Sequence, residues 1–176
     1  SKLGGDLHKE TELYFFHTNG PYRKIAKTVN FGMIYQQTPE GLAIQAGVSV
    51  QRAREFMTGW FGRYGGATEW IHDIQESAMR THYVSTPLGR RIYIREADES
   101  SEYYNPPEAI RKAVNYPIQG GAAEIVKLAM IKCQHLTMLL QVHDELLFSG
   151  RVEVPDLSHV SSIHTPYKIK YTETWE

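Results

Sequence analysis

The sequence of 176 residues has little of what marks several specialised classes of protein. It has one cysteine, Cys133, so it can form no disulfide within the chain and has no CxxC pair for zinc. No apolar run approaches the roughly 20 residues that a membrane span needs, and no signal peptide is visible. A net charge of −1 gives no overall sign of binding to a polyanion. We therefore expect a globular protein of a reducing compartment, the cytoplasm by default, with no membrane partner.

Glycine and proline divide the chain into segments with distinct periodicities, without repeats or low-complexity tracts. Helical patterns cover residues 6–17, 22–35, 49–64 and 67–80, with a short segment at 39–46. Residues 83–94 alternate around a turn at Pro87–Gly89, which predicts a β-hairpin, and residues 95–107 read as a loop. Residues 108–134 are again helical in pattern, and we expect interruptions at Pro117 and at Gly120–Gly121.

The stretch QVHDELLF, residues 141–148, places three polar residues between two apolar runs. TMLLQV and LLF are almost purely apolar, which is typical of two strands of a covered sheet, so His143, Asp144 and Glu145 would fall at the tip of a hairpin. Paired strands hold a carboxylate rigidly, as a metal ligand requires. A polar turn without any function explains the same residues, so this stretch alone does not decide between a metal site and a simple turn.

A second informative stretch is YRKIAKTVNFGMIYQQTPEGLA, residues 22–43. Arg23, Lys27, Phe31 and Tyr35 recur every four residues, so on a helix they form one stripe of two cations followed by two aromatic rings. Such a stripe can clamp a polyphosphate and stack against a base or a sugar. A solvated basic face beside a half-buried aromatic pair is the alternative.

Four blocks of sequence, in order, resemble the family A DNA polymerases, the bacterial DNA polymerase I type. The pattern R-x3-K-x3-F-G-x2-Y, which includes Gly32, resembles motif B of that family, and QVHDELLF resembles its motif C. Between them, LGRRIYI at 88–94 and RKAVNYPIQGGAAEIVKLAMI at 111–131 are similar to the intervening blocks. DLHKET near the start and the terminal YTETWE resemble the flanks. The resemblance implies an α+β fold, with a helical fingers subdomain over residues 1–82 and part of an antiparallel-sheet palm subdomain over residues 83–176.

The resemblance also implies roles for the stripe. Arg23 and Lys27 would bind the phosphates of the incoming deoxynucleoside triphosphate, and Lys27 would protonate the pyrophosphate leaving group. Phe31 and Tyr35 would pack beside the sugar and the base, with Tyr35 near the templating position. Phenylalanine at position 31 resembles family members that discriminate against dideoxynucleotides. Gln36 follows where the family usually has glycine, so we expect an altered joint at the helix end.

Further roles follow from the other blocks. Asp144, with Glu145 beside it, would bind the catalytic Mg²⁺, of which two ions are expected, and His143 would lie near the primer terminus. Contacts with the primer-template DNA are expected from three residues spaced by four: Arg111, Asn115 and Gln119. The family's motif A, which carries a second essential aspartate, belongs upstream of DLHKET, so an upstream polymerase segment is an expected partner. The location would be the cytoplasm of a bacterial or phage-infected cell, or an organelle.

Three functions remain open on the sequence. The first is template-directed DNA synthesis by a partial polymerase domain. The second is a catalytically incomplete fragment that binds nucleotide or DNA and needs an upstream palm segment. The third is an HD-type metal phosphohydrolase built on His143–Asp144, which would require that pair on a helix with further histidines at helical spacing.

Overall fold

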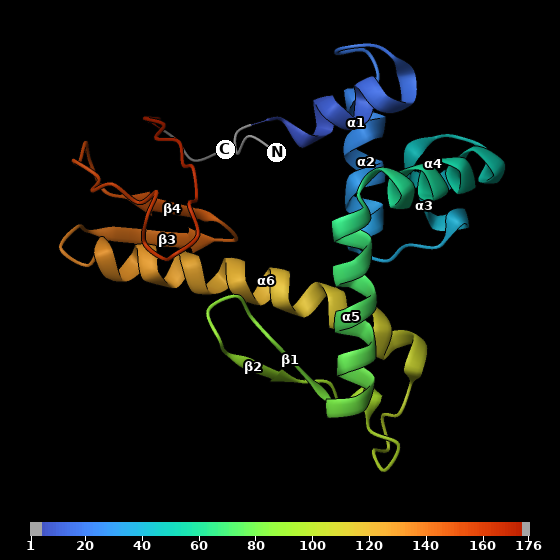
Figure 1. The fold of residues 1–176 in the computed structure, drawn as a ribbon. Coiled ribbons are helices and arrows are strands. Elements are labelled where there is room, and N and C mark those ends of the chain that lie inside the picture. The colour runs from blue at the N-terminus through green and yellow to red at the C-terminus, as the bar shows by residue number, and fades with distance from the viewer. Residues whose placement is uncertain (1–4, 174–176) are drawn as a thin grey trace. The chain divides into compact units, whose positions relative to one another are not determined.

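The computed structural model describes residues 5–173, which form helices and two two-stranded sheets (Figure 1). The helices are α1 Leu7–Phe16, α2 Arg23–Ile34, α3 Pro39–Ala46, α4 Val50–Arg63, α5 Gly65–Thr81, the 3-10 helix η1 Arg95–Ala97, and α6 Pro106–Lys132. The strands are β1 Tyr83–Ser85, β2 Arg91–Tyr93, β3 Met138–Val142 and β4 Glu145–Phe148. The predicted α+β class and the predicted helices before residue 82 are confirmed.

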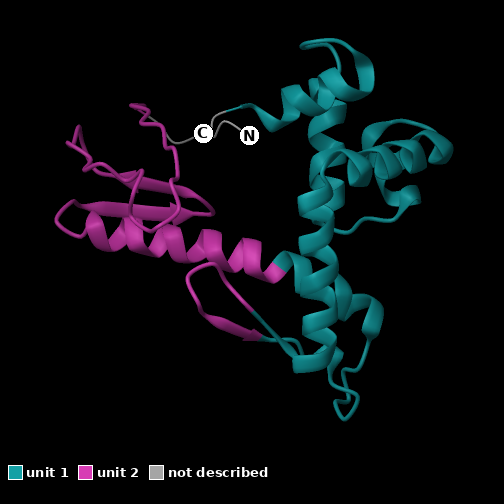
Figure 2. Cartoon of the chain, viewed as in Figure 1, with its two compact units in different colours: residues 1–84, 93–115 teal, residues 85–92, 116–176 magenta. Residues whose placement is uncertain are grey.

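The chain divides into two compact units, each with contacts of its own (Figure 2). Unit 1 consists of residues 1–84 and 93–115, and unit 2 of residues 85–92 and 116–176. The tip of the β1–β2 hairpin therefore groups with the second half of α6, and the division is not a single cut along the sequence. The proposed boundary between fingers and palm at residue 82 stays a prediction.

Unit 1 has a well-defined hydrophobic core beneath the first four helices. Its largest fully buried side chain is Phe56 of α4, 1% exposed, whose ring meets that of Phe15 at 5.1 Å in an edge-to-face arrangement. The other buried members are Val29, Met33, Leu42, Ala43, Ala53, Trp60, Ile71 and Val114. Capping fixes where the helices start, because the side chains of Asp6, Thr38 and Ser49 accept backbone N–H groups at the starts of α1, α3 and α4.

A buried polar network ties three helices of unit 1 together. The Asn30 amide oxygen in α2 accepts hydrogen bonds from Thr11 Oγ1 of α1, at 3.1 Å, and from Trp60 Nε1 of α4, at 2.8 Å. Thr11 Oγ1 also lies 2.8 Å from the Tyr64 hydroxyl. Because a buried amide left unpaired is costly, these bonds fix the rotation of α2 about its axis as well as its position.

Helix α6 corrects one expectation, because it runs without interruption from Pro106 through Pro117 to Lys132. Within unit 2 the glycines serve close packing and do not end the helix. A Cβ on Gly120 would lie 2.9 Å from Thr86 Cγ2, and one on Gly121 would lie 2.9 Å from Pro87 Cδ. The β1–β2 turn therefore approaches the α6 backbone more closely than a side chain would permit.

Strands β3 and β4 form the predicted antiparallel hairpin, in which Val142 pairs with Glu145 across the turn. The expectation of a covered sheet was wrong, because Leu139 is 60% and Leu140 41% exposed. Within the described residues no further strand pairs with this two-stranded sheet, so each strand has one unpaired edge there. Residues 149–173 contain no further helix or strand, and the end of the YTETWE block lies outside the described residues. Over residues 5–173, no helix is both long and apolar enough to cross a membrane.

Candidate functional site

The four residues of the predicted stripe lie together on the solvent face of α2. Arg23, Lys27, Phe31 and Tyr35 are all exposed, and Phe31 and Tyr35 keep 40% and 41% of their surface. The opposite face, with Ala26, Val29 and Met33, is buried in the core of unit 1. The core thus fixes which face of α2 is presented to solvent.

The stripe residues also contact one another. The rings of Phe31 and Tyr35 are 6.1 Å apart at 24°, a stacked arrangement, and Lys27 Nζ lies 5.6 Å from the centre of the Phe31 ring. Two exposed rings held nearly parallel offer an apolar surface for a planar ligand, and the ammonium group beside them offers a charge. The alternative of a half-buried aromatic pair describes these two side chains equally well, because Phe31 and Tyr35 are only 40% and 41% exposed.

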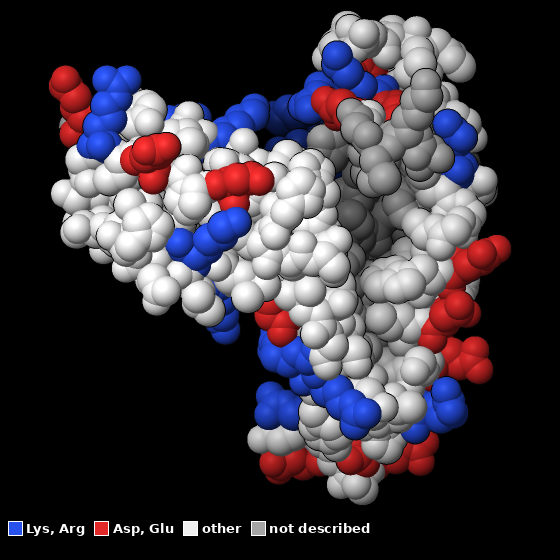
Figure 3. All heavy atoms as spheres, turned by 60° about the vertical axis from the view of Figure 1, so that its left-hand side comes forward, with Lys and Arg blue, Asp and Glu red and all other residues white. Residues whose placement is uncertain are grey.

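Arg23, the first residue of α2, is held by an acid of α1. Its Nη2 donates to Asp6 Oδ2 at 2.7 Å, and its Nε donates to the same oxygen at 3.3 Å. The hydrogen bond from Arg23 holds the pKa of Asp6 below its ordinary value, and the backbone N–H groups of Lys9 and His8 add to the effect. On the face shown in Figure 3, basic and acidic side chains occur in small groups.

His8 is a residue of this site that the sequence analysis did not identify. Its Nδ1 lies 3.0 Å from the Asn30 amide nitrogen, and its ring centre lies 5.8 Å from that of Phe31. Burial lowers the pKa of His8, Asp6 raises it, and the nearby charges of Arg23 and Lys27 lower it further. No local sequence pattern predicts this position of His8, because it depends on a contact with Asn30, 22 residues away.

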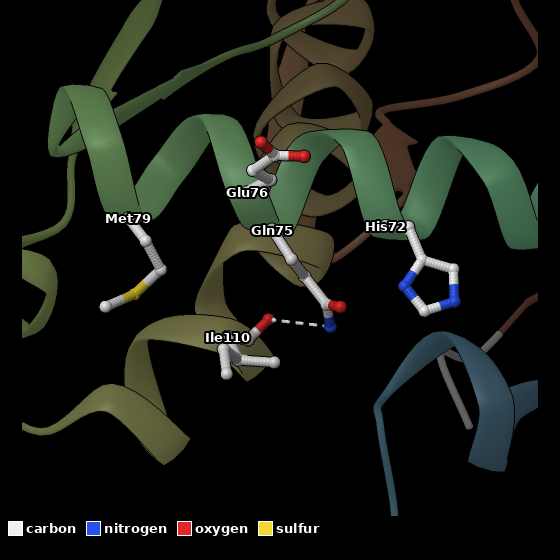
Figure 4. Close-up of a pocket in the computed structure, with 5 residues that line it drawn as sticks. All are labelled: His72, Gln75, Glu76, Met79 and Ile110. Atoms are coloured by element: carbon white, nitrogen blue, oxygen red, sulfur yellow. Dashed lines mark hydrogen bonds between the residues drawn. The ribbon is translucent and has the colours of Figure 1, made fainter.

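The chain leaves α2 through a strained residue. Gln36 has a φ of 51°, a conformation in which glycine is more usual, and its Nε2 donates to Met33 O at 2.8 Å. Gln75 of α5 donates from Nε2 to Gln36 Oε1 at 3.2 Å and to Ile110 O at 3.5 Å. Figure 4 shows Gln75 pointing from α5 toward Ile110, in an open groove also lined by His72, Glu76 and Met79. Two side-chain hydrogen bonds therefore support the joint after Tyr35.

The predicted metal ligands lie in unit 2, at the turn of the β3–β4 hairpin. His143 has a φ of 52°, and its carbonyl oxygen accepts a hydrogen bond of 2.7 Å from Gln141 Nε2. Asp144 completes the turn, Glu145 begins β4, and both are exposed. In the described part of the chain, no group of three or more His, Cys, Asp or Glu side chains is placed to hold a metal ion.

The three residues expected to contact DNA lie on α6, two in unit 1 and one in unit 2. Arg111 is exposed and pairs with Glu108, one turn earlier. Asn115 donates from Nδ2 to Arg111 O at 2.9 Å, and its Oδ1 is buried without a hydrogen-bond partner among the described residues. Gln119, in unit 2, is exposed. Within unit 1 the structure thus brings the four stripe residues together. Within unit 2 it separately brings the three hairpin residues together.

Comparison with known proteins gives one consistent family. The family model described as DNA polymerase family A matches residues 2–165. DNA polymerase I of Mycobacterium tuberculosis is 38% identical over 158 residues, which cover 82% of this chain and 17% of the relative. DNA polymerase I of Geobacillus stearothermophilus is 33% identical over 193 residues, with 97% of this chain and 22% of the relative covered. The chain thus spans about a fifth of the length of these curated relatives.

A solved structure agrees with the sequence matches. The POL domain of Pol1 from M. smegmatis, in complex with DNA primer-template and dNTP, is 37% identical and superposes with a TM-score of 0.71. The match covers 82% of this chain and 28% of that one. Sequence and structure therefore show that the chain belongs to family A of the DNA polymerases.

Proposed function

We propose that this chain contributes the nucleotide-binding helix and the motif C hairpin to a polymerase that extends a primer 3′ end with deoxynucleoside triphosphates on a DNA template. The observation that carries the proposal is the solvent-exposed stripe of α2, in which two cations lead into two stacked rings. A triphosphate joined to a sugar and a base has the same order of charge and apolar surface. The M. smegmatis relative, whose structure holds DNA primer-template and dNTP, is consistent with these partners.

Arg23 and Lys27 bind the phosphates in this proposal. A guanidinium group binds phosphate oxygens in pairs, and the ammonium group of Lys27, one turn along α2, adds a second charge and a proton for the pyrophosphate leaving group. Without a ligand, Arg23 forms an ion pair with Asp6, in which Nη2 lies 2.7 Å from Oδ2. The triphosphate therefore has to compete with one carboxylate for Arg23, and its greater charge favours the exchange.

Phe31 and Tyr35 then position the sugar and the base. Their parallel rings leave room for a planar group to continue the stack, with Tyr35 next to the templating position. Phe31 carries no hydroxyl, which matches the expected discrimination against dideoxynucleotides. Gln36 and Gln75 would restrict how freely the end of α2 moves when the site closes, because the Gln36 side chain is bonded both to Met33 of α2 and to Gln75 of α5.

Asp144 and Glu145 would hold the divalent cation, and their environment fits Mg²⁺ in part. Mg²⁺ is bound through one or two carboxylates, waters and substrate phosphates, and two exposed carboxylates on a hairpin can supply the protein's share. When bound, two such ions lower the pKa of the primer hydroxyl and neutralise charge on the triphosphate. The described residues offer no third metal-binding side chain nearby, so we propose that an upstream palm segment with the family's motif A completes the site.

The DNA would be contacted by His143, Arg111, Asn115 and Gln119. Arg111 and Gln119 are exposed and carry donors for phosphate oxygens or base edges in the minor groove. Asn115 has a carbonyl oxygen that is buried and unpartnered in the described chain, so a small shift of this side chain would make an acceptor available. His143 occupies the hairpin turn beside the proposed metal ligand, as a residue near the primer terminus would.

A second candidate is a fragment that binds nucleotide or DNA without catalysing the reaction alone. It is favoured by the scarcity of metal ligands around Asp144 among residues 5–173. The HD-type phosphohydrolase is disfavoured, because His143–Asp144 lies in a hairpin turn and not on a helix.

Primer extension with Mg²⁺ tests the proposal, using the chain alone, an Asp144→Ala variant and a Lys27→Ala variant. Binding of dATP to each protein is measured in parallel by calorimetry. We expect Lys27→Ala to weaken dATP binding about tenfold, which corresponds to one lost hydrogen bond to a charged group. Extension that Asp144→Ala abolishes would support catalysis by this chain, and dATP binding without extension would support the second candidate. Equal dATP binding by wild type and Lys27→Ala would contradict the role of the stripe.

A further inference from the structure

Glu12 is a fully buried acid in α1 that no step of the proposed function uses. Its Oε1 accepts three hydrogen bonds, from Thr18 Oγ1 at 3.2 Å, the Gly20 backbone N–H at 2.8 Å and the Tyr22 backbone N–H at 2.9 Å. Its Oε2 is buried without a hydrogen-bond partner in the described part of the chain. A buried carboxylate is costly unless its partners are well placed, so its position here calls for a reason beyond core packing.

All three donors belong to the turn that connects α1 to α2. Gly20 has a φ of 127°, which side chains rarely adopt, and this conformation lets the N–H groups of residues 20 and 22 point to the same oxygen. The turn is also closed by Phe16 and Tyr22, whose rings stack at 4.5 Å. Hydrogen bonds from N–H groups to a carboxylate are stronger than bonds between neutral groups, so the bonds to Glu12 hold this turn more firmly than a neutral acceptor would.

Helix α2 has no cap of its own at the end where Arg23 lies. Tyr22 makes no side-chain capping bond, and the first turn of α2 contains no acid. Burial raises the pKa of Glu12, but the hydrogen bonds from Tyr22, Gly20 and Thr18 and the charge of Arg23 offset it, so the pKa is below its ordinary value. Glu12 is therefore ionised at neutral pH and supplies the negative charge that favours a helix N-terminus.

We propose that Glu12 is a positioning residue for Arg23: by holding the turn 18–22 it fixes where α2 begins and where the Arg23 guanidinium group stands. Asp6 and Glu12 hold different parts of this region. Asp6 binds the side chain of Arg23, whereas Glu12 binds the backbone N–H of Tyr22, the residue before it. This role of Glu12 rests on the proposed function in one respect only, that the ligand of Arg23 is a nucleoside triphosphate. Its structural part stands on the contacts of Glu12 alone.

Glu12→Gln is the variant that tests this, since it keeps the shape of the side chain and removes the charge. Glu55→Gln is the matched control, because Glu55 is an exposed acid of α4 that also pairs with an arginine, Arg52, at 2.7 Å. In both proteins, and in wild type, NMR follows amide hydrogen exchange at Gly20 and Tyr22 and the Nε–H signal of Arg23, and calorimetry measures dATP binding with Mg²⁺.

In Glu12→Gln we expect exchange at Gly20 and Tyr22 to rise about tenfold, the Arg23 Nε–H signal to move, and dATP binding to weaken several-fold. Glu55→Gln should leave all three unchanged. A lower melting temperature with wild-type exchange and an unmoved Arg23 signal would overturn the proposal, because it would leave Glu12 a purely structural acid.

Thr18→Val serves if Glu12→Gln does not fold, since it removes one donor and leaves the carboxylate in place. It should produce the same changes to a smaller extent, and an unmoved Arg23 signal there would again overturn the proposal. Wild-type protein that binds no dATP would count against the proposed function, while the exchange and Arg23 signals would still decide the role of Glu12.

Discussion

Unit 1 and the β3–β4 hairpin bury their apolar residues very differently. In unit 1, Val29 and Phe56 are 0% and 1% exposed beneath the stripe of α2. In the β3–β4 hairpin, by contrast, Leu139 and Leu140 keep 60% and 41% of their surface exposed. An isolated two-stranded hairpin is marginally stable, whereas a helix packed on a core is held in one rotation. The proposed nucleotide-binding residues are therefore fixed by this chain's own core, whereas the proposed metal ligands lie on a two-stranded hairpin with exposed leucines.

Substitutions in the core of unit 1 should lower the free energy of unfolding more than any others in this comparison. Replacing Phe56 with alanine removes the largest fully buried side chain and leaves a cavity against Phe15 and Phe16. We expect a loss of about 3–5 kcal/mol in the free energy of unfolding, measured by urea denaturation. The conservative Phe56→Leu should lose less, because it fills more of the cavity. A loss below about 1 kcal/mol for Phe56→Ala would contradict a tightly packed core.

Replacing one glycine in each unit with alanine should change the stability of the chain in opposite directions. Gly120→Ala in unit 2 would press a Cβ to 2.9 Å from the buried, β-branched Thr86 side chain. Overpacking of about 1–3 kcal/mol should exceed the gain of about 1 kcal/mol from better helix propensity, so we expect a net loss. Gly62→Ala in α4 meets nothing within 4 Å and should instead stabilise the chain. Thermal unfolding of both variants gives the signs, and a stabilised Gly120→Ala would refute the close approach.

Acid should weaken unit 1 through Asp98. The Tyr93 hydroxyl donates to Asp98 Oδ2 at 2.5 Å, and this bond, followed by those from Ser100, lowers the pKa of Asp98 to about 2. A carboxyl with a lowered folded pKa stabilises the fold above its unfolded pKa of about 3.9, and that contribution disappears as the pH falls through about 2.

Tyr93→Phe removes the main donor and should make unfolding less dependent on pH between 5 and about 2. Tyr104→Phe is the control, because the Tyr104 hydroxyl makes no hydrogen bond to the described residues. Denaturation midpoints across that range measure the difference. Identical pH profiles for Tyr93→Phe and wild type would show that Asp98 titrates normally.

The sequence predicted local structure well and distant contacts poorly. The four-residue spacing of the stripe correctly placed its four residues on one face of α2, because helical periodicity is a local property. Pro117, Gly120 and Gly121 were wrongly predicted to interrupt α6, and the two glycines are instead explained by the β1–β2 turn, which packs closely on them. His8 and Glu12 gave no signal at all, because their partners, Asn30 and the turn 18–22, are fixed only by the fold. The prediction that β3 and β4 lie in a covered sheet was wrong for the same reason, since the composition of a strand does not say whether another layer packs on it.

The hairpin should respond least to substitution if its apolar side is exposed as the structure shows. Leu139→Thr keeps a side chain suited to a strand and removes apolar surface that is 60% exposed. We expect a change within about 0.5 kcal/mol in the free energy of unfolding, as for other surface sites. A loss of about 2 kcal/mol or more would mean that Leu139 is covered in solution, because only a buried leucine loses that much on truncation. The hairpin would then be held as firmly as α2, and the contrast between the two regions would disappear.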